Sequence, residues 1–274
     1  MIVSGPKLSH EPAGDLSRLW FQSLSSEEGR SLRLFCLPYA GGDTYGFRSW
    51  QRHFPPYIDL CLVHLPGRGK RIDERMFTRL IPLVETIADI ITHEPQLPYA
   101  LFGHSMGALI SFELARELRR RGFAAPRRLF LSGRSAPDVT RREAPIFNLP
   151  EEAFIAAVGS FNGTPKQVFA HPETMKFFLP VLRADLEMLD TYKYQPQEPL
   201  SCPLTVYAGL QDADAPVDGL RAWEKHTSAR CDFRVFNGDH FFIHTPSIGF
   251  VDVFRRDVLS TLHHFEQPAS TTSG

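Results

Sequence analysis

The feature that most constrains this sequence is the pentapeptide GHSMG at 103–107, together with what flanks it. An apolar run at 99–103 precedes the serine, and a segment of helical periodicity at 106–121 follows it. A strand that turns into a helix within two residues needs small side chains at the turn, and the two glycines provide that clearance. The sequence therefore predicts a sharp strand–turn–helix unit with Ser105 at its tip.

Short apolar runs alternate with helical patterns on both sides of this unit. We expect strands at 32–38, 59–65, 99–103, 128–132, 204–208 and 233–236, and helices at 80–93, 106–121, 219–226 and 250–265. Such alternation predicts an α/β fold, with a mostly parallel sheet and helices on both faces. The length, 274 residues, suits one large domain, 1–274, with ample chain for a buried core.

One segment breaks the alternation. Residues 136–199 contain no convincing strand, but they show helical patterns at 151–161 and 172–192. We expect 139–199 to form a helical lid inserted in the domain, because long insertions on α/β cores often cover an active site. The segment is rich in phenylalanine, and we expect some of these rings to line a substrate channel. The phenylalanines are Phe147, Phe154, Phe161, Phe169, Phe177 and Phe178.

The position of Ser105 favours nucleophilic chemistry. It lies at the N-terminal end of a predicted helix, where free N–H groups and the helix dipole stabilise a developing negative charge. A serine hydroxyl is a poor nucleophile without an adjacent base. His240 is the favoured base, because it lies between the last strand and the last helix and the chain order in folds with such a turn is Ser, acid, His. His244 is the alternative.

The remaining two elements of a serine hydrolase site also have candidates. The strand at 204–208 leads into two aspartates, of which Asp212 is the favoured acid and Asp214 the alternative. The acid would hold the imidazole tautomer and stabilise the imidazolium. An oxyanion hole needs two backbone donors, and we assign these to Met106, after the nucleophile, and to Ala40, in the glycine turn after the first strand.

With these residues in place, the sequence resembles the stand-alone type II thioesterases associated with polyketide and nonribosomal peptide synthetases. The segments that carry the resemblance are LFCLPYAGGDTYGFRSW (34–50), LPGRGKR (65–71), LFGHSMGALISFELARELRRRG (101–122), LFLSGRSAP (129–137), LRADLEMLDTYKY (182–194) and GDHFFI (238–243). One departure is Ala215, where the family often has valine three residues after the acid, and it keeps Asp214 open.

The resemblance implies the α/β-hydrolase fold with an inserted helical lid. It also implies hydrolysis of acyl thioesters from the phosphopantetheine arm of carrier proteins, for editing or for release of products, by Ser105, Asp212 and His240. No metal and no diffusible cofactor is implied. The alternative is an esterase or an acyltransferase on the same fold, which a comparison of oxygen esters with thioesters would distinguish.

Composition excludes several other classes of protein. Lys plus Arg is 30 and Asp plus Glu is 31, which gives a net charge of −1 and argues against a nucleic-acid partner. No apolar run approaches the roughly 18 residues of a membrane span, and the N-terminus has no apolar signal core, so we expect a cytoplasmic location. The four cysteines are scattered, which favours free thiols over disulfides or zinc.

The partner prediction combines the resemblance with charge. Arginines cluster at 68–79, 116–128 and 134–142, and such clusters could attract an acidic carrier protein. The alternative is that they are ordinary solvated side chains and that contact with the carrier is mainly apolar. We expect the protein to act as a monomer.

Overall fold

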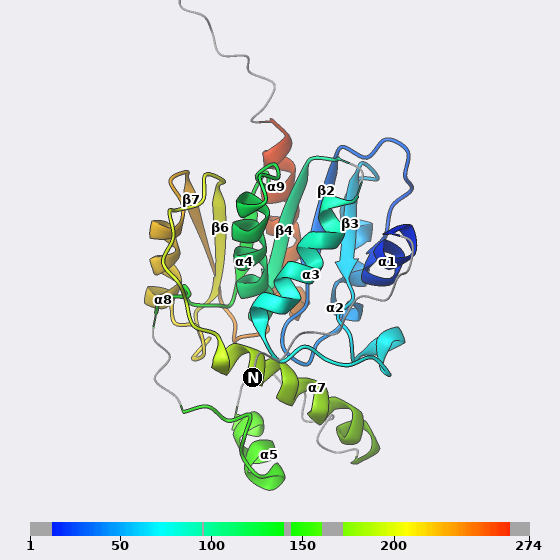
Figure 1. The fold of residues 1–274 in the computed structure, drawn as a ribbon. Coiled ribbons are helices and arrows are strands. Elements are labelled where there is room, and N and C mark those ends of the chain that lie inside the picture. Colours follow the sequence, from blue (N-terminus) through cyan, green and yellow to red (C-terminus); the bar gives the residue numbers. More distant parts are fainter. Residues whose placement is uncertain (1–12, 95, 140–143, 161–171, 264–274) are drawn as a thin grey trace, which may run out of the picture.

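The computed structural model describes residues 13–94, 96–139, 144–160 and 172–263. They form a seven-stranded sheet in the order β1-β3-β2-β4-β5-β6-β7, in which β1 is antiparallel to β3 and every other pair is parallel (Figure 1). The strands are β1 Phe21–Ser23, β2 Leu32–Leu37, β3 Ile58–Val63, β4 Tyr99–His104, β5 Leu129–Ser132, β6 Leu204–Gly209 and β7 Cys231–Phe236. The prediction of an α/β fold with a mostly parallel sheet is confirmed.

The α-helices among these residues are α1 Ala13–Trp20, α2 Tyr45–Arg48, α3 Leu80–Thr92, α4 Met106–Arg120, α5 Glu151–Ser160, α7 Pro172–Thr191, α8 Val217–Arg221 and α9 Phe250–His263. Short 3₁₀ helices are η1 Ser49–His53, η2 Gly69–Arg71, η3 Ala222–His226, η4 Phe242–His244 and η5 Pro246–Ile248. The predicted helix at 219–226 is therefore split into α8 and η3. The predictions at 161, 264 and 265 lie outside the described residues.

The predicted strands at six positions all occur, with ends that differ by one or two residues. The seventh strand, β1, and the helix α1 before it were not expected. β1 has three residues, which are too few to display a period-two pattern. It becomes a strand because it pairs with the free edge of β3, with Phe21 opposite Val63.

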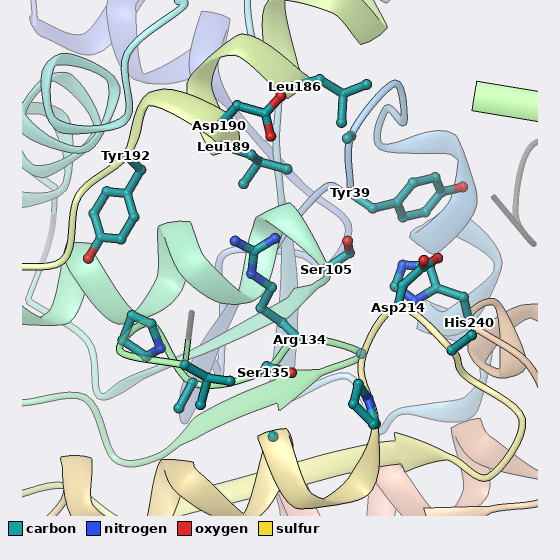
Figure 2. Close-up of a pocket in the computed structure, with 18 of the residues that line it drawn as sticks. Tyr39, Ser105, Arg134, Ser135, Leu186, Leu189, Asp190, Tyr192, Asp214 and His240 are labelled. Carbon is teal, nitrogen blue, oxygen red and sulfur yellow. The ribbon is translucent and has the colours of Figure 1, made fainter. Parts of the chain in front are cut away.

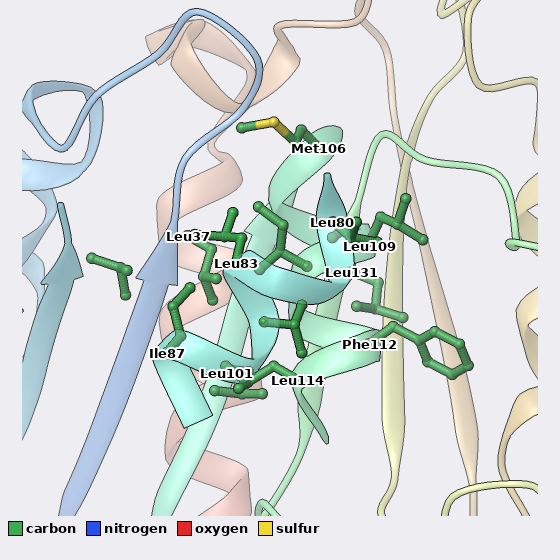
Figure 3. Packing of buried hydrophobic residues seen from close by; sticks show 14 of the residues in the cluster. Leu37, Leu80, Leu83, Ile87, Leu101, Met106, Leu109, Phe112, Leu114 and Leu131 are labelled. Carbon is green, nitrogen blue, oxygen red and sulfur yellow. The ribbon is translucent and has the colours of Figure 1, made fainter. Parts of the chain in front are cut away.

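Alternate side chains of each strand enter two separate cores, because successive residues of a strand point to opposite faces. In β2, Phe35 and Leu37 pack on the face covered by α1, α3 and α4, which Figure 3 shows in part. Leu34 and Cys36 pack on the other face, against α9, α2 and η1. Both faces are buried, as in parallel sheets generally, and this explains why the strands are mostly apolar. The charged Arg33 of β2 and Asp59 of β3 are buried as an ion pair.

The carboxyl ends of β2, β4, β5, β6 and β7 all lie at one edge of the sheet, because these strands are parallel. The loops that follow these strands carry the predicted site residues, and α7 and α5 lie beyond the same edge (Figure 1). The four cysteines are free, three of them buried. No helix in the described part of the chain is both long and apolar enough to cross a membrane.

Candidate active site

Ser105 occupies a strained backbone position between β4 and α4. Its φ is 53° and its ψ is −112°, and it is the one residue other than glycine with positive φ among those that the structure describes. Its N–H donates to the Ser132 carbonyl at 2.8 Å, which ties the turn to β5. Such strain persists only where the surroundings enforce it, and it concentrates at functional sites.

The two glycines of the pentapeptide enforce that turn. A Cβ on Gly107 would lie 2.2 Å from the Leu37 carbonyl oxygen, and a Cβ on Gly103 would lie 2.0 Å from the backbone of Gly107. Both contacts are with backbone atoms, which cannot move aside as a flexible side chain can. The sequence predicted a tight turn that only small residues permit. The contacts at Gly103 and Gly107 confirm this prediction.

His240 is hydrogen-bonded to Asp212, which lies at the same edge of the sheet. Its Nδ1 is 2.8 Å from Oδ2 of Asp212, and the Asp212 side chain is fully buried. The other oxygen, Oδ1, accepts the N–H groups of Asp214 at 3.0 Å and Ala215 at 3.1 Å. Three bonds thus hold the carboxylate. The side chain of Asp214 is exposed, so the structure pairs His240 with Asp212.

The same residues form the one cluster with metal-type ligands in the described part of the chain. Ligand atoms of Asp212, Asp214 and His240 lie within 4.8 Å of one another. Hydrogen bonds already engage the His240 Nδ1 and both Asp212 oxygens. The arrangement matches an oriented imidazole, in which Nδ1–H donates to the carboxylate and Nε2 is left for proton transfer.

The other histidines near the site have different surroundings. His104 is fully buried, with Nδ1 2.9 Å from the Ser132 hydroxyl and its ring 4.9 Å from that of His240. Burial, followed by the neighbouring imidazoles, lowers the pKa of His104 well below its usual range. His244 packs between aromatic rings, 5.5 Å from Tyr39, and burial lowers its pKa as well. Both rings pack against aromatic neighbours, which include Phe241.

The predicted oxyanion donors lie where the loop after β2 meets α4. The Gly42 N–H donates to the Tyr39 carbonyl at 2.9 Å, and Gly41 has a φ of 71°, which are features of a type II turn. Ala40 in this turn and Ser105 both line the same cavity. Met106 is the first residue of α4, where backbone N–H groups have no acceptor within the helix.

The cavity in front of Ser105 has a volume of about 920 Å³. Figure 2 shows Ser105 and His240 on one wall, with Leu186 and Leu189 of α7 opposite and Arg134 extending between them. Aliphatic side chains supply most of the apolar lining, and Asp190 and Lys193 add charge. The cavity is therefore mixed in polarity. Sequence reasoning missed Arg134, although its place directly after β5, at the edge that carries the site, was a usable signal.

The predicted phenylalanine channel is wrong for the phenylalanines that the structure describes. None of the described phenylalanines of the insertion lines the cavity, although Phe241, which follows β7, does. Phe154 is buried beneath the guanidinium of Arg183, Phe178 packs on Gly41, and Phe177 is 64 % exposed. Phe161 and Phe169 lie outside the described residues. Phe154 and Phe178 attach the inserted helices to the domain, and leucines and valines of the insertion line the cavity instead.

Comparison with known proteins gives a family match over most of the chain. Residues 32–257 match the family model of the thioesterase domain. The chain is 41 % identical over 225 residues to "Gramicidin S biosynthesis protein GrsT" of Aneurinibacillus migulanus, covering 82 % of this chain and 88 % of the relative.

Solved structures are similar as well. "RedJ-Thioesterase from the Prodiginine biosynthetic pathway in Streptomyces coelicolor" has a TM-score of 0.78 and 34 % identity, covering 95 % of this chain and 98 % of that one. "YbtT - Type II thioesterase from Yersiniabactin NRPS/PKS biosynthetic pathway" has a TM-score of 0.77 and 29 % identity, covering 88 % and 99 %.

Proposed function

This chain belongs to the thioesterase family, and from that premise we propose that it hydrolyses acyl thioesters on the phosphopantetheine arm of carrier proteins, for editing or release in polyketide or nonribosomal peptide synthesis. The observation that carries the proposal is the pairing of His240 with buried Asp212 beside the strained Ser105, at the wall of a cavity of about 920 Å³. The relatives supply the class of substrate.

The proposed reaction begins with attack of the Ser105 hydroxyl oxygen on the thioester carbonyl. His240 takes the hydroxyl proton at Nε2, while its Nδ1–H donates to Asp212 and stabilises the imidazolium. The N–H groups of Ala40 and Met106 donate hydrogen bonds to the carbonyl oxygen as negative charge develops on it.

The tetrahedral adduct then collapses to an acyl-serine and a thiol. A thiol has a pKa of about 8.5, so a thiolate leaves more readily than an alkoxide. The imidazolium of His240 gives its proton to the departing sulfur and becomes a neutral base again. Water, deprotonated by His240, attacks the acyl-serine and releases the carboxylic acid together with the free hydroxyl of Ser105.

The test is hydrolysis of a panel of acyl-pantetheine thioesters by the wild type and by Ser105→Ala. We expect the variant to fold, since the turn accepts a small side chain, and to lose at least about 10³-fold in kcat. An activity above about a tenth of the wild type would contradict the assignment of Ser105. Faster hydrolysis of matched oxygen esters than of thioesters would favour the esterase alternative.

A carrier protein as partner remains part of the proposal. The comparison that tests it is kcat/KM on the same acyl group attached to a carrier protein and to coenzyme A, at low and high salt. We expect the carrier to be preferred, and equal values would exclude the preference. We also propose that the protein is a monomer at assay concentration, which light scattering measures. The cytoplasmic location predicted from the sequence is part of the same proposal.

The arginine clusters contribute less to carrier docking than their number suggested. Arg68, Arg71, Arg116 and Arg128 are each at most 8 % exposed and bind acidic side chains within the domain. They hold loops and helices together and cannot face a partner. We therefore expect most of the carrier preference to survive at high salt, because salt weakens only the part that depends on exposed charges, and the buried arginines do not contribute to that part.

A further inference from the structure

The turn that carries Ala40 is held by a buried ion pair from two distant parts of the chain. We propose that Asp185 of α7 and Arg68 are positioning residues for the oxyanion hole, so that α7 sets the geometry in which the Ala40 N–H meets the substrate carbonyl. The inference rests on the hydrolytic function proposed above, and it assigns roles to two residues that take no part in the bond-making steps.

Arg68 and Asp185 form a bidentate salt bridge. Arg68 Nη2 donates to Asp185 Oδ1 at 2.7 Å, and Nη1 donates to Oδ2 at 2.8 Å. Asp185 is fully buried and Arg68 is 8 % exposed. Desolvation of two charges offsets most of their attraction, so such a pair is a weak source of stability. We infer that the main role of the pair is to orient the backbone next to it.

What it orients is the turn at 39–42. The Gly41 N–H donates to Asp185 Oδ2 at 2.8 Å, and Arg68 Nη1 donates to the Gly42 carbonyl at 3.0 Å. Both charged groups thus contact the backbone of the turn and each other. A hydrogen bond to an ionised group is stronger and shorter than one between neutral groups, so this backbone is firmly fixed.

These bonds fix the peptide units on both sides of Ala40. The unit before it has its carbonyl, that of Tyr39, bound to the Gly42 N–H. The unit after it has its N–H, that of Gly41, bound to Asp185. In a trans peptide the N–H points opposite to the carbonyl, so the direction of the Ala40 N–H follows from the anchored Tyr39 carbonyl.

Helix α7 also packs directly on the turn. A Cβ on Gly41 would lie 2.8 Å from the Phe178 ring and 3.2 Å from Leu182, both on α7. The same helix lines the cavity with Leu182, Leu186 and Leu189. The helix that lines the cavity therefore also holds the turn that carries the proposed Ala40 donor, and the Arg68–Asp185 pair links the helix to the turn.

The test compares Asp185→Asn with Glu187→Gln. Glu187 lies two residues further along α7 and forms an exposed ion pair with Arg79, so its variant removes one charge from the same helix without touching the turn. The readouts are kcat and KM on an acyl N-acetylcysteamine thioester, the rate at which a fluorophosphonate labels Ser105, and the melting temperature.

Removal of a whole oxyanion donor typically lowers kcat by about 10²- to 10³-fold, so for a misaligned donor we expect Asp185→Asn to lose about 10- to 100-fold. KM should change little, because the interaction acts on the tetrahedral adduct, and labelling by the fluorophosphonate should slow in parallel. Glu187→Gln should stay within about twofold of the wild type, as exposed ion pairs contribute little.

Arg68→Lys is the second variant, and it covers the case in which Asp185→Asn does not fold. It keeps the positive charge but cannot hold both carboxylate oxygens and the Gly42 carbonyl in one plane, so we expect a similar loss of kcat. A folded Asp185→Asn or Arg68→Lys protein with wild-type kcat and labelling rate would overturn the proposal. An equal loss in Glu187→Gln would do so too, because it would reduce the pair to general attachment of α7.

The two proposals fail separately. If the wild type hydrolyses no thioester, the proposed function is wrong, and the labelling rates of the variants still test the positioning role. If the wild type hydrolyses thioesters and the variants match it, the function stands and the positioning role is wrong.

Discussion

At the scale of single residues, the main question is which of two nearby aspartates, Asp212 or Asp214, orients His240. Asp212 is fully buried and accepts three hydrogen bonds, whereas the Asp214 side chain is exposed two residues further on. A buried carboxylate at Nδ1 fixes the imidazole tautomer more firmly than an exposed one, because water competes less for its hydrogen bonds.

Substitution at these two positions should therefore have unequal effects. We expect Asp212→Asn to lower kcat by about 10⁴-fold, because an amide at this position favours the wrong tautomer of His240. Asp214→Asn should stay within about tenfold of the wild type, since the side chain is exposed and the variant keeps the backbone N–H that donates to Asp212. Steady-state kinetics on one thioester decides the point, and the reverse order of the two losses would make Asp214 the acid.

His104 should make the free energy of unfolding depend on pH in the acidic range. Its folded pKa is lowered by burial, so below about pH 6.5 the unfolded chain binds a proton that the folded chain excludes. The free energy of unfolding should be independent of this group above pH 6.5 and should fall by on the order of 1 kcal/mol per pH unit below it.

The measurement is urea unfolding at pH 7.5, 6.5 and 5.5. His104→Asn is the informative variant, because an amide oxygen can replace Nδ1 as partner of the Ser132 hydroxyl at 2.9 Å without titrating. We expect a flatter pH dependence in the variant. An identical slope in the two proteins would show that His104 does not carry the effect.

At the scale of elements, the decisive contact is the close approach of β4, α4 and β2. The first turn of α4 lies against the end of β2, and the approach is possible because position 107 carries no side chain. A glycine on the inserted helix α5 does not permit any comparable close contact. Gly159 in α5 would place a Cβ in open space.

These two helical glycines should respond in opposite directions to alanine. Gly107→Ala forces a methyl group to within 2.2 Å of the Leu37 carbonyl, and we expect a loss of about 3 kcal/mol or more in the free energy of unfolding. Gly159→Ala should gain up to about 1 kcal/mol from helix propensity. Denaturant titration of both variants measures the difference, and a neutral Gly107→Ala would contradict the packing argument.

At the scale of the whole molecule, the insertion divides into two differently attached helices. α7 has buried side chains along most of its described length and carries the buried Asp185 that binds Arg68. In α5, buried side chains are limited to Phe154 and Val158 among those described. We propose, on this basis, that the lid at 139–199 is not a uniform unit but a fixed helix and a more loosely held one.

Hydrogen exchange followed by mass spectrometry tests this division. Helices with few buried contacts open at lower free energy, so we expect amides of α5 to exchange faster than those of α7, and those of β4 and α4 to exchange most slowly. A trapped acyl group on Ser105 should slow exchange in the insertion further. Equal protection of α5 and α7 would argue against two modes of attachment.

Much of this architecture was readable from the sequence. The runs of apolar residues set the strands, the periodicity set the helices, and the glycines at 103 and 107 marked the turn, because each signal depends on neighbours in the chain. The order Ser105, acid, His240 followed from the chain order of folds with such a turn, with Asp212 favoured over Asp214. The structure brings Ser105, Asp212 and His240 to one edge of the sheet.

The tertiary structure alone decided the rest. β1 is too short for a pattern and exists through its pairing with β3. The choice of leucines over phenylalanines along the cavity, and the union of Arg68 with Asp185, 117 positions apart, depend on how α7 lies across the sheet edge. Such contacts leave no periodic trace in the sequence, because a buried charge is stabilised by a distant partner and not by its neighbours in the chain.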